Sequence, residues 1–390
     1  MNNRSLYRSA FWGAAFLMAT SAIGPGFLTQ TAVFTEKLVA AFGFSILVSI
    51  IIDVIVQLNI WRIILSWNKP AQQIANELFP GLGFLLSLMI LLGGLAFNIG
   101  NVAGAGLGLN VITGMDTRIC ALISAAAGII LMLVKDAAKA MDRFVQLLGV
   151  LMIGLTCYVA IVAAPPIGKA LAGTFWPEVI DWKSIVTIVG GTVGGYICFA
   201  GAHRLLEAKL PEEQRMRSVS SAAIRGVITV SVMRYVLFLA ALGVVCAGLT
   251  LDKGNPAAAV FRHAAGDVGY RLFGIVLWSA AITSVIGSAY TSVSFIRSWH
   301  PLLERYHKQV LVAFISVSTI VFLLVGQPVK LLITAGMING FILPFSLFIL
   351  IAANLKSRKK EGYQHPAWLS ITGLLVALLL TWIAIQVLIF

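Results

Sequence analysis

The chain has 390 residues, of which 59% are hydrophobic and 11% are charged, and its formal net charge is +13. A soluble domain cannot hide that much apolar surface, whereas a bilayer accommodates it in spans of about 20 residues. Composition therefore predicts an integral membrane protein. Basic residues collect in the cytoplasmic loops of such proteins, so the positive charge does not indicate a nucleic-acid partner.

Eleven apolar segments predict the membrane-spanning helices, since open sheets cannot satisfy their backbone groups in lipid. The predicted fold class is thus an all-α integral membrane protein. No cleavable signal peptide is expected, because the first apolar stretch is too long for one. The segments lie roughly at 11–38, 44–67, 84–109, 118–134, 144–164, 185–206, 222–247, 272–299, 310–325, 331–354 and 367–390.

The sequence predicts no enzyme, cofactor or resident metal. It has no nucleotide-binding loop, nucleophile–base pattern or paired carboxylates in a loop. Its cysteines all fall inside apolar segments, where they form neither a disulfide framework nor a metal-ligand spacing. They are Cys120, Cys157, Cys198 and Cys246.

Lysine and arginine predict the orientation. If the N-terminus is cytoplasmic, nineteen basic residues fall in cytoplasmic regions and eight in outside regions. This asymmetry favours a multi-pass protein of the cell membrane with its N-terminus inside and its C-terminus outside. The basic run from Lys356 to Lys360 is the last cytoplasmic determinant, and its expected partner is anionic membrane lipid.

The first segment contains a predicted helix break. Pro25 removes a backbone donor and clashes with the preceding turn, and Gly24 and Gly26 loosen the helix on either side. We therefore expect the helix to unwind over Gly24–Gly26 near the middle of the membrane.

The second and seventh segments each carry one charge at depth. Asp53 and Arg234 both lie about 14–18 Å from a membrane surface at 1.5 Å per residue. An isolated charge there costs about 2.5–3.5 kcal/mol on insertion scales. The sequence therefore predicts an intramembrane charge pair between Asp53 and Arg234, with either a structural or a functional role.

The sixth segment contains a second predicted break. Four glycines within six residues, from Gly190 to Gly195, weaken a helix considerably. We expect the break over Gly191–Gly195, facing the first break at the middle of the membrane. Segments one and six are the first members of two consecutive sets of five, and interrupted helices at matching places indicate an inverted-repeat transporter. We expect one transmembrane domain over 1–390, with repeats at about 11–164 and 185–354 and an extra helix at 367–390.

The order of these features resembles the NRAMP (natural resistance-associated macrophage protein) family of divalent-metal transporters over nearly the whole chain. Three further stretches carry the resemblance. They are Asn76–Gly81 before the third segment, Trp278–Gly287 in the eighth and Leu343–Phe345 in the tenth. The resemblance implies a LeuT-like fold of five plus five helices with an eleventh C-terminal helix.

The sequence departs from the family at its metal-binding motifs. The family's first-helix motif is D-P-G-N, and its Asp and Asn correspond here to Gly24 and Phe27. The sixth-helix M-P-H corresponds to Gly194, Gly195 and Tyr196. The acidic residues of the third helix correspond to Asn98 and Asn101, which cannot titrate. Divalent and transition-metal ions need anionic oxygen, thioether or imidazole ligands, so the sequence predicts a shared scaffold without the metal site.

The remaining groups at the two breaks suit a small organic acid or amino-acid-like solute, because a helix N-terminus offers donors and positive dipole to a carboxylate. Relatives of this bacterial branch are often encoded beside 5-oxoproline-degrading enzymes, so the resemblance also suggests pyroglutamate. The expected binding residues are Gly24, Pro25, Gly26, Phe27, Thr29, Gln30, Asn98, Thr192, Gly194, Gly195 and Tyr196.

The leading hypothesis is a secondary active transporter that moves this small-molecule solute by alternating access, with a proton or sodium ion as a possible coupling cation. A proton-coupled divalent metal transporter is the alternative on the same fold. A channel or receptor is the third. A channel would not require two matched breaks, and receptors usually append a signalling domain.

Overall fold

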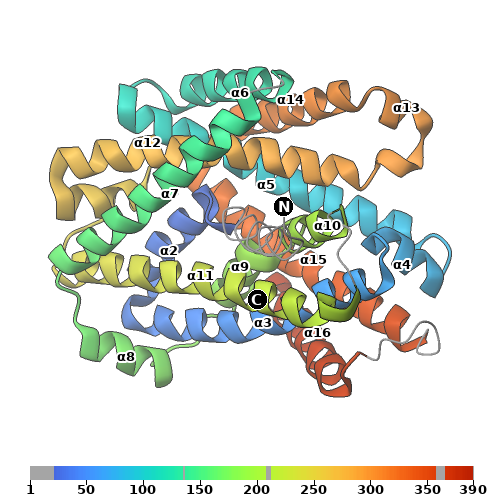
Figure 1. The fold of residues 1–390 in the computed structure, drawn as a ribbon. Helices are drawn as coiled ribbons and strands as arrows, with labels where there is room; N and C mark the ends of the chain where they lie inside the picture. The colour runs from blue at the N-terminus through green and yellow to red at the C-terminus, as the bar shows by residue number, and fades with distance from the viewer. Residues whose placement is uncertain (1–21, 135–136, 208–211, 357–364, 390) are drawn as a thin grey trace.

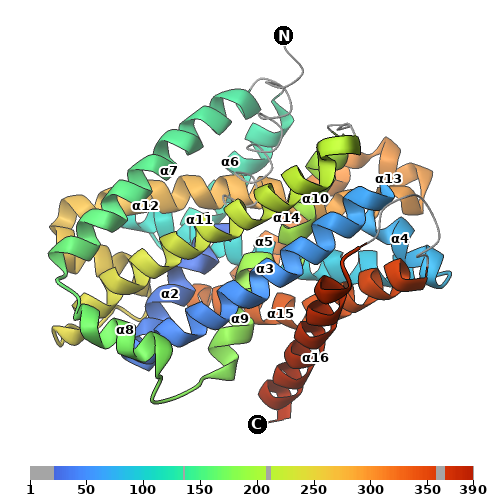
Figure 2. The same cartoon turned by 60° about the horizontal axis from the view of Figure 1, so that its bottom comes forward.

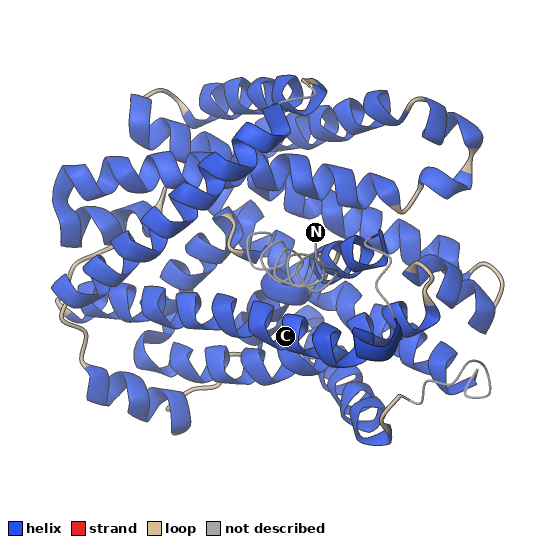
Figure 3. Ribbon diagram, viewed as in Figure 1, coloured by secondary structure: helices blue, strands red, loops and turns tan. Residues whose placement is uncertain are grey.

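The computed structural model describes residues 22–134, 137–207, 212–356 and 365–389, and within these ranges it contains helices and loops without a strand (Figure 3). The helices are α2 (Pro25–Leu38), α3 (Phe42–Trp67), α4 (Ala71–Leu78), α5 (Leu82–Thr113), α6 (Thr117–Leu133), α7 (Ala137–Val162), α8 (Ile167–Phe175), α9 (Trp182–Val193), α10 (Ile197–Glu207), α11 (Glu212–Cys246), α12 (Pro256–Ser294), α13 (Pro301–Arg305), α14 (His307–Val325), α15 (Pro328–Lys356) and α16 (Ala367–Ile389). Short 3-10 turns lie at Val39–Ala41 and Arg297–Trp299.

The long helices lie side by side, with α8 near one end of the bundle and α4 and α13 near the other (Figures 1 and 2). We call these the α8 end and the α4 end. Helices α5 and α12 pack closely along the bundle, because Gly108 leaves space where a Cβ atom would lie 2.5 Å from the backbone nitrogen of Trp278. Small residues permit such backbone approach between membrane helices.

The predicted membrane class agrees with the observed helices. In the described part of the chain, eight helices are long and apolar enough to cross a membrane, or nine if the bent pair Leu148–Val162 and Ile167–Phe175 is one span. A continuous stretch over Pro25–Trp67 counts once there, although α2 and α3 match two predicted segments. Residues 1–21, which hold part of the first predicted segment, lie outside the described residues.

Several helices extend beyond the apolar segments. Helix α11 begins at Glu212 rather than near 222, and α12 begins at Pro256 rather than near 272. A kink divides α12 at Gly266, whose φ is +61°. The added turns carry charged residues such as Arg262, so a search for apolar runs does not find them. The same reason hides the short helices α4 and α13.

Both predicted helix breaks are confirmed, with shifted bounds. The first lies at Ile23–Gly24, and α2 begins at Pro25 because proline suits the first position of a helix. The second lies at Gly194–Tyr196, between the end of α9 and the start of α10. Gly26 and Gly191 are helical, contrary to the prediction, since neither a first-turn glycine nor an isolated pair suffices to end a helix.

Candidate functional site

The first break lies against α5 and α12. Gly104 of α5 lets the backbone pass so close that a Cβ atom there would lie 2.1 Å from Cβ of Pro25. A Cβ atom on Gly24 would lie 3.4 Å from the Ser284 hydroxyl and 3.8 Å from the amide oxygen of Asn101. The open turn at Gly24 is therefore lined by neutral oxygen groups from two other helices.

Gln30 joins α2 to the helices of the second repeat. Its amide nitrogen donates to the carbonyl of Leu332 in α15 at 3.0 Å. Its amide oxygen is buried without a partner and would lie 2.6 Å from a Cβ atom on Gly191. Gln30 thus holds a structural bond and also presents an unpartnered acceptor toward α9.

The second break depends on Gly195, whose φ is +52°. A Cβ atom there would lie 1.6 Å from the amide oxygen of Asn339 in α15. Asn339 uses its amide nitrogen to donate to the carbonyls of Gly93 and Ala335, both at 2.9 Å, and its oxygen has no partner. Only glycine satisfies both the left-handed backbone and the close approach.

Tyr196, at the end of this break, joins a neutral polar cluster. Its ring packs edge to face on Phe97 at 5.5 Å between centroids, and its hydroxyl lies beside the side chains of Asn101 and Ser288. The Ser288 hydroxyl donates to Oδ1 of Asn98 at 3.1 Å, while Nδ2 of Asn98 is buried without a partner. The structure therefore brings the predicted residues Asn98 and Tyr196 into one cluster.

Arg234 of α11 places a positive charge between the two breaks. It is 2% exposed. Its guanidinium carbon lies 4.4 Å from the centre of the Phe27 ring, near the start of α2, and Nη2 donates to the hydroxyl of Thr192 at 3.1 Å, near the end of α9. Nη1 is buried without a hydrogen-bond partner. One cation thus contacts a residue beside each break and retains an unpartnered donor group.

Asp53 of α3 is the acidic counterpart of Arg234. It is 1% exposed, its Oδ1 atom has no hydrogen-bond partner, and it interacts electrostatically with Arg234. Four ion pairs within 4.0 Å occur among the described residues, and none joins these two. The charges influence each other without direct contact, and the predicted pairing stays a prediction.

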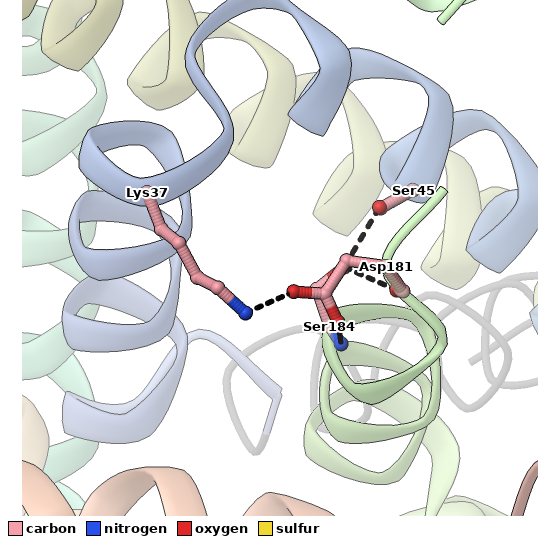
Figure 4. Close-up of polar contacts among 4 residues, drawn as sticks. All are labelled: Lys37, Ser45, Asp181 and Ser184. Atoms are coloured by element: carbon pink, nitrogen blue, oxygen red, sulfur yellow. Dashed lines mark hydrogen bonds and ion pairs between the residues drawn. The ribbon is translucent and has the colours of Figure 1, made fainter. Parts of the chain in front are cut away.

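A contact at the α8 end links α2, which follows the first break, to the residue before α9, which precedes the second break. Lys37, in the last turn of α2, forms an ion pair with Asp181, which precedes α9 (Figure 4). Asp181 also accepts from the backbone amide of Ser184 at 3.1 Å and thereby caps α9. The Ser184 hydroxyl lies 2.8 Å from the hydroxyl of Ser45 in α3.

The other predicted residues are placed consistently with the two breaks. Thr29 is buried on α2, and Gly194 continues the α9 bonding by donating its amide to the carbonyl of Gly190 at 3.2 Å. The prediction missed Ser288 and Asn339. The sequence held a signal for Asn339, which lies between Gly336 and Gly340 in an apolar segment. A buried polar residue in such a segment needs a hydrogen-bond partner.

Metal ligands do not gather in the described part of the chain. No group of three or more His, Cys, Asp or Glu side chains there could hold a metal ion. The groups at the breaks are instead neutral amides and hydroxyls with one guanidinium. In such a set, the Arg234 guanidinium can donate hydrogen bonds to a carboxylate, and the amides and hydroxyls can bind the other polar groups of an organic solute.

The comparisons with known proteins agree with this architecture. The family model described as "Natural resistance-associated macrophage protein-like" matches residues 15–390. The membrane protein YcsG of Bacillus subtilis (strain 168) is 54% identical, over 95% of this chain and 92% of its own length. A solved manganese transporter of Eremococcus coleocola, in a mutant form, has a TM-score of 0.76 at 15% identity, and the match covers 99% of this chain and 88% of that one. MhsT in complex with L-phenylalanine has a TM-score of 0.65 at 18% identity, over 97% and 98%.

These similarities confirm the predicted LeuT-like fold, which the two solved transporters share, and they cover the region of both breaks. The chain therefore belongs to the natural resistance-associated macrophage protein family and is a membrane transporter.

Proposed function

We propose that this transporter carries a small organic carboxylate by alternating access, with the solute bound between the two helix breaks. The observation that carries the proposal is the position of Arg234. Its buried guanidinium contacts Phe27 and Thr192 and keeps Nη1 without a partner. A buried donor group without a partner is costly, and a carboxylate would supply two acceptor oxygens in the geometry that guanidinium prefers.

The surrounding groups suit the rest of such a solute. Beside Arg234, the Phe27 ring offers an apolar face, and the cluster of Asn98, Asn101 and Tyr196 offers neutral donors and acceptors. Pyroglutamate fits this description, since it combines a carboxylate with a ring amide. It is the first member of the set of solutes to be tested.

A divalent cation is the competing substrate, because a solved structure of similar fold is named a manganese transporter. The charge of Arg234 argues against it. A cation between the breaks would face a guanidinium rather than a carboxylate, and like charges in a low-dielectric site repel strongly. The described residues also gather no metal-ligating cluster.

The distribution of basic residues supports a location in the cell's inner membrane with the N-terminus cytoplasmic, which puts the α8 end outside. In this orientation Lys37 and Asp181 lie at the outer surface. A coupling cation, proton or sodium, would drive uptake from that side.

An uptake panel in proteoliposomes tests the proposal. The purified protein is given radiolabelled L-pyroglutamate, L-proline, acetate and 54Mn2+ in separate assays. We expect a carboxylate to accumulate, and manganese to enter no faster than in empty vesicles. Calorimetry that shows micromolar manganese binding, abolished by Tyr196→Ala or Thr29→Ala, would favour the metal substrate instead.

A further inference from the structure

A line of buried polar residues runs along one side of α3. Ser45, Ser49, Asp53 and Gln57 follow one another at intervals of four residues, and each is at most 3% exposed. Residues four apart are offset by about 40° around a helix, with about 6 Å of rise between them, so the line winds slowly along α3. In a helix that crosses the membrane, buried polar and ionisable residues are costly and commonly mark a path for ions or protons.

This line begins at the α8 end, and its third member, Asp53, interacts with Arg234. At its start, the Ser45 hydroxyl contacts Ser184, which is bonded to Asp181 near the surface (Figure 4). Two turns further along, the buried Asp53 interacts electrostatically with Arg234, and Gln57 follows one turn later. The line therefore joins a partly exposed carboxylate to a fully buried one.

Several buried polar groups of α3, α9 and α11 have no hydrogen-bond partner. They are Oδ1 of Asp53, both amide atoms of Gln57, the hydroxyl of Thr187 and Nη1 of Arg234. Buried polar groups normally have partners, and each exception needs an explanation. Groups that exchange protons or ligands during a transport cycle provide one, because their partners are present in only part of the cycle.

The electrostatics of Asp53 follow from few charges. Arg234 is the charged group that acts on it. The other charged residues of the described helices that pack on α3 lie near the helix ends, and α16 has none. Among the residues whose side chains are described, they are Glu36 and Lys37 of α2, Glu77 of α4, Lys169 of α8, Lys183 of α9, and Lys330 and Lys356 of α15. Arg62 lies nine residues after Asp53 on α3 itself, and Arg225 lies nine residues before Arg234 on α11.

From these observations we infer that Asp53 binds the coupling proton, that the polar face of α3 is its route from the α8 end, and that the exchange with solute occurs at Arg234. This inference rests on the proposed carboxylate substrate. It names the coupling ion, the residue that carries it and the stoichiometry.

Charge balance gives the mechanism. Without solute, the positive Arg234 is balanced by the negative Asp53, and the buried site is neutral. When a solute carboxylate binds Arg234, the site would carry one net negative charge, which is costly in a low-dielectric interior. Uptake of one proton by the Asp53 carboxylate restores neutrality. Release of that proton on the other side makes Asp53 negative again, so that it balances Arg234 and the solute leaves.

The consequence is an electroneutral symport of one proton with one monocarboxylate. The proton and the monocarboxylate cross together with no net charge, so a membrane potential does no work on their transport. Thermodynamic linkage also requires that solute affinity rise as pH falls, by up to about tenfold per pH unit while Asp53 is ionised in the empty protein and protonated in the loaded one.

The test uses the purified full-length protein and L-pyroglutamate, which is ionised throughout the range used. Calorimetry at pH 6, 7 and 8 gives the dissociation constant, and a pH-indicator dye in weakly buffered solution gives the protons taken up on binding. We expect about one proton per bound pyroglutamate and an affinity that weakens toward pH 8. In Asp53→Asn, proton uptake falls at least about tenfold and the affinity no longer varies with pH.

The matched control is Asp116→Asn, an exposed N-cap of α6 at which asparagine also caps a helix. It should bind pyroglutamate with the proton uptake of the unmodified protein. Infrared difference spectra supply a second readout, since a protonated-carboxyl band should appear on solute addition in the unmodified protein and be absent from Asp53→Asn.

The unmodified protein alone can overturn the inference, even if Asp53→Asn does not fold. In proteoliposomes, a potassium–valinomycin potential should leave the pyroglutamate uptake rate unchanged, whereas a pH gradient should drive accumulation. Potential-driven uptake, binding without proton uptake, or sodium-dependent binding that is insensitive to pH each rules out the proton at Asp53. Absence of pyroglutamate and other carboxylate binding at any pH overturns the proposed substrate itself, which distinguishes the two failures.

Discussion

At the scale of single residues, the site depends on one guanidinium and on one glycine. Arg234 combines a ring contact with Phe27, a hydrogen bond to Thr192 and an unpartnered Nη1 atom. Arginine differs from lysine in presenting a planar fork of donors that matches a carboxylate. Gly195 is required for a different reason, because its backbone is left-handed and its neighbour Asn339 occupies the space of a side chain.

Substituting Arg234 should separate charge from geometry. Arg234→Lys keeps the charge opposite Asp53 but loses the fork, and Arg234→Gln loses both. We expect uptake of L-pyroglutamate to fall at least about tenfold in both variants, since hydrogen bonds to charged groups contribute about 1.5–3 kcal/mol. Only Arg234→Gln should also lower the melting temperature in detergent, because it leaves Asp53 buried without its counter-charge.

Arg262→Gln is the matched control for these variants. Arg262 is exposed and forms a surface ion pair with Asp267, so its loss should change neither uptake nor melting temperature appreciably. Unchanged uptake in Arg234→Lys would show that the fork does not bind the solute.

Substituting Gly195 should destabilise the second break. Gly195→Ala places a Cβ atom 1.6 Å from the Asn339 oxygen and forces an L-residue to φ +52°. The left-handed backbone alone costs about 1–2 kcal/mol, and the clash adds to it. We expect a lower melting temperature in detergent and little uptake.

A double variant separates the two causes. Adding Asn339→Ala to Gly195→Ala removes the clash but not the backbone strain, so it should restore part of the lost stability. Gly149→Ala is the control, because a Cβ atom there meets nothing within 4 Å. A double variant no more stable than Gly195→Ala would mean that the clash contributes nothing.

At the scale of elements, side-chain hydrogen bonds fix where the last helix packs, which helix propensity alone does not determine. Helix α16 is held against α3 by Asn59, whose amide nitrogen donates to the carbonyl of Leu369 at 3.0 Å. The amide oxygen of Asn59 lies 3.0 Å from Nε2 of His365, just before α16. Burial, together with the nearby charge of Arg62, lowers the pKa of His365 to about 4.

This histidine should make stability depend on pH. An unfolded histidine titrates near pH 6.5, so between about pH 6.5 and 4 the unfolded chain binds more protons at His365 than the folded one. The free energy of unfolding therefore falls as pH falls through that window, and the loss of stability due to His365 is complete below about pH 4. Melting temperatures in detergent at pH 7.5 and 5.0 should show the decrease.

His365→Gln removes the titrating group while keeping a hydrogen-bonding side chain. We expect its melting temperature to decrease less between pH 7.5 and 5.0 than that of the unmodified protein. Equal decreases in the two proteins would exclude His365 as a source of the acid sensitivity.

At the scale of the whole molecule, the direction of transport depends on which end of the bundle faces outward. Basic residues favour the α4 end as cytoplasmic. The polar face of α3 starts at the opposite end, where Lys37 pairs with Asp181. Orientation and proposed proton route thus agree on entry from outside.

Cysteine labelling in intact cells tests that orientation. Lys253 lies in the exposed loop between α11 and α12, and Arg305 lies in α13 at the other end. In a background where the exposed Cys157 and Cys246 are replaced by serine, Lys253→Cys should react with a membrane-impermeant maleimide and Arg305→Cys should not. The reverse pattern would invert the predicted topology.

The sequence by itself determined the membrane class, the existence of both breaks, and a helix in each of the eleven predicted segments, the first of them only in its described part. These follow from local properties, namely the length of apolar runs and the effect of proline and clustered glycine on a helix. The bounds of the breaks were less well determined. A helix can start at Pro25 and continue through Gly191 when neighbouring helices pack around it.

Only the tertiary structure decided which residues meet. Sequence depth alone led to a pair of Asp53 with Arg234, yet the structure places the guanidinium directly on Phe27 and Thr192. It also brings Asn339 to Gly195 and Ser288 to Asn98, across more than a hundred residues of chain. Such contacts depend on the relative rotation and depth of helices, which arise from packing over whole helix surfaces and leave no local signature in the residues that finally touch.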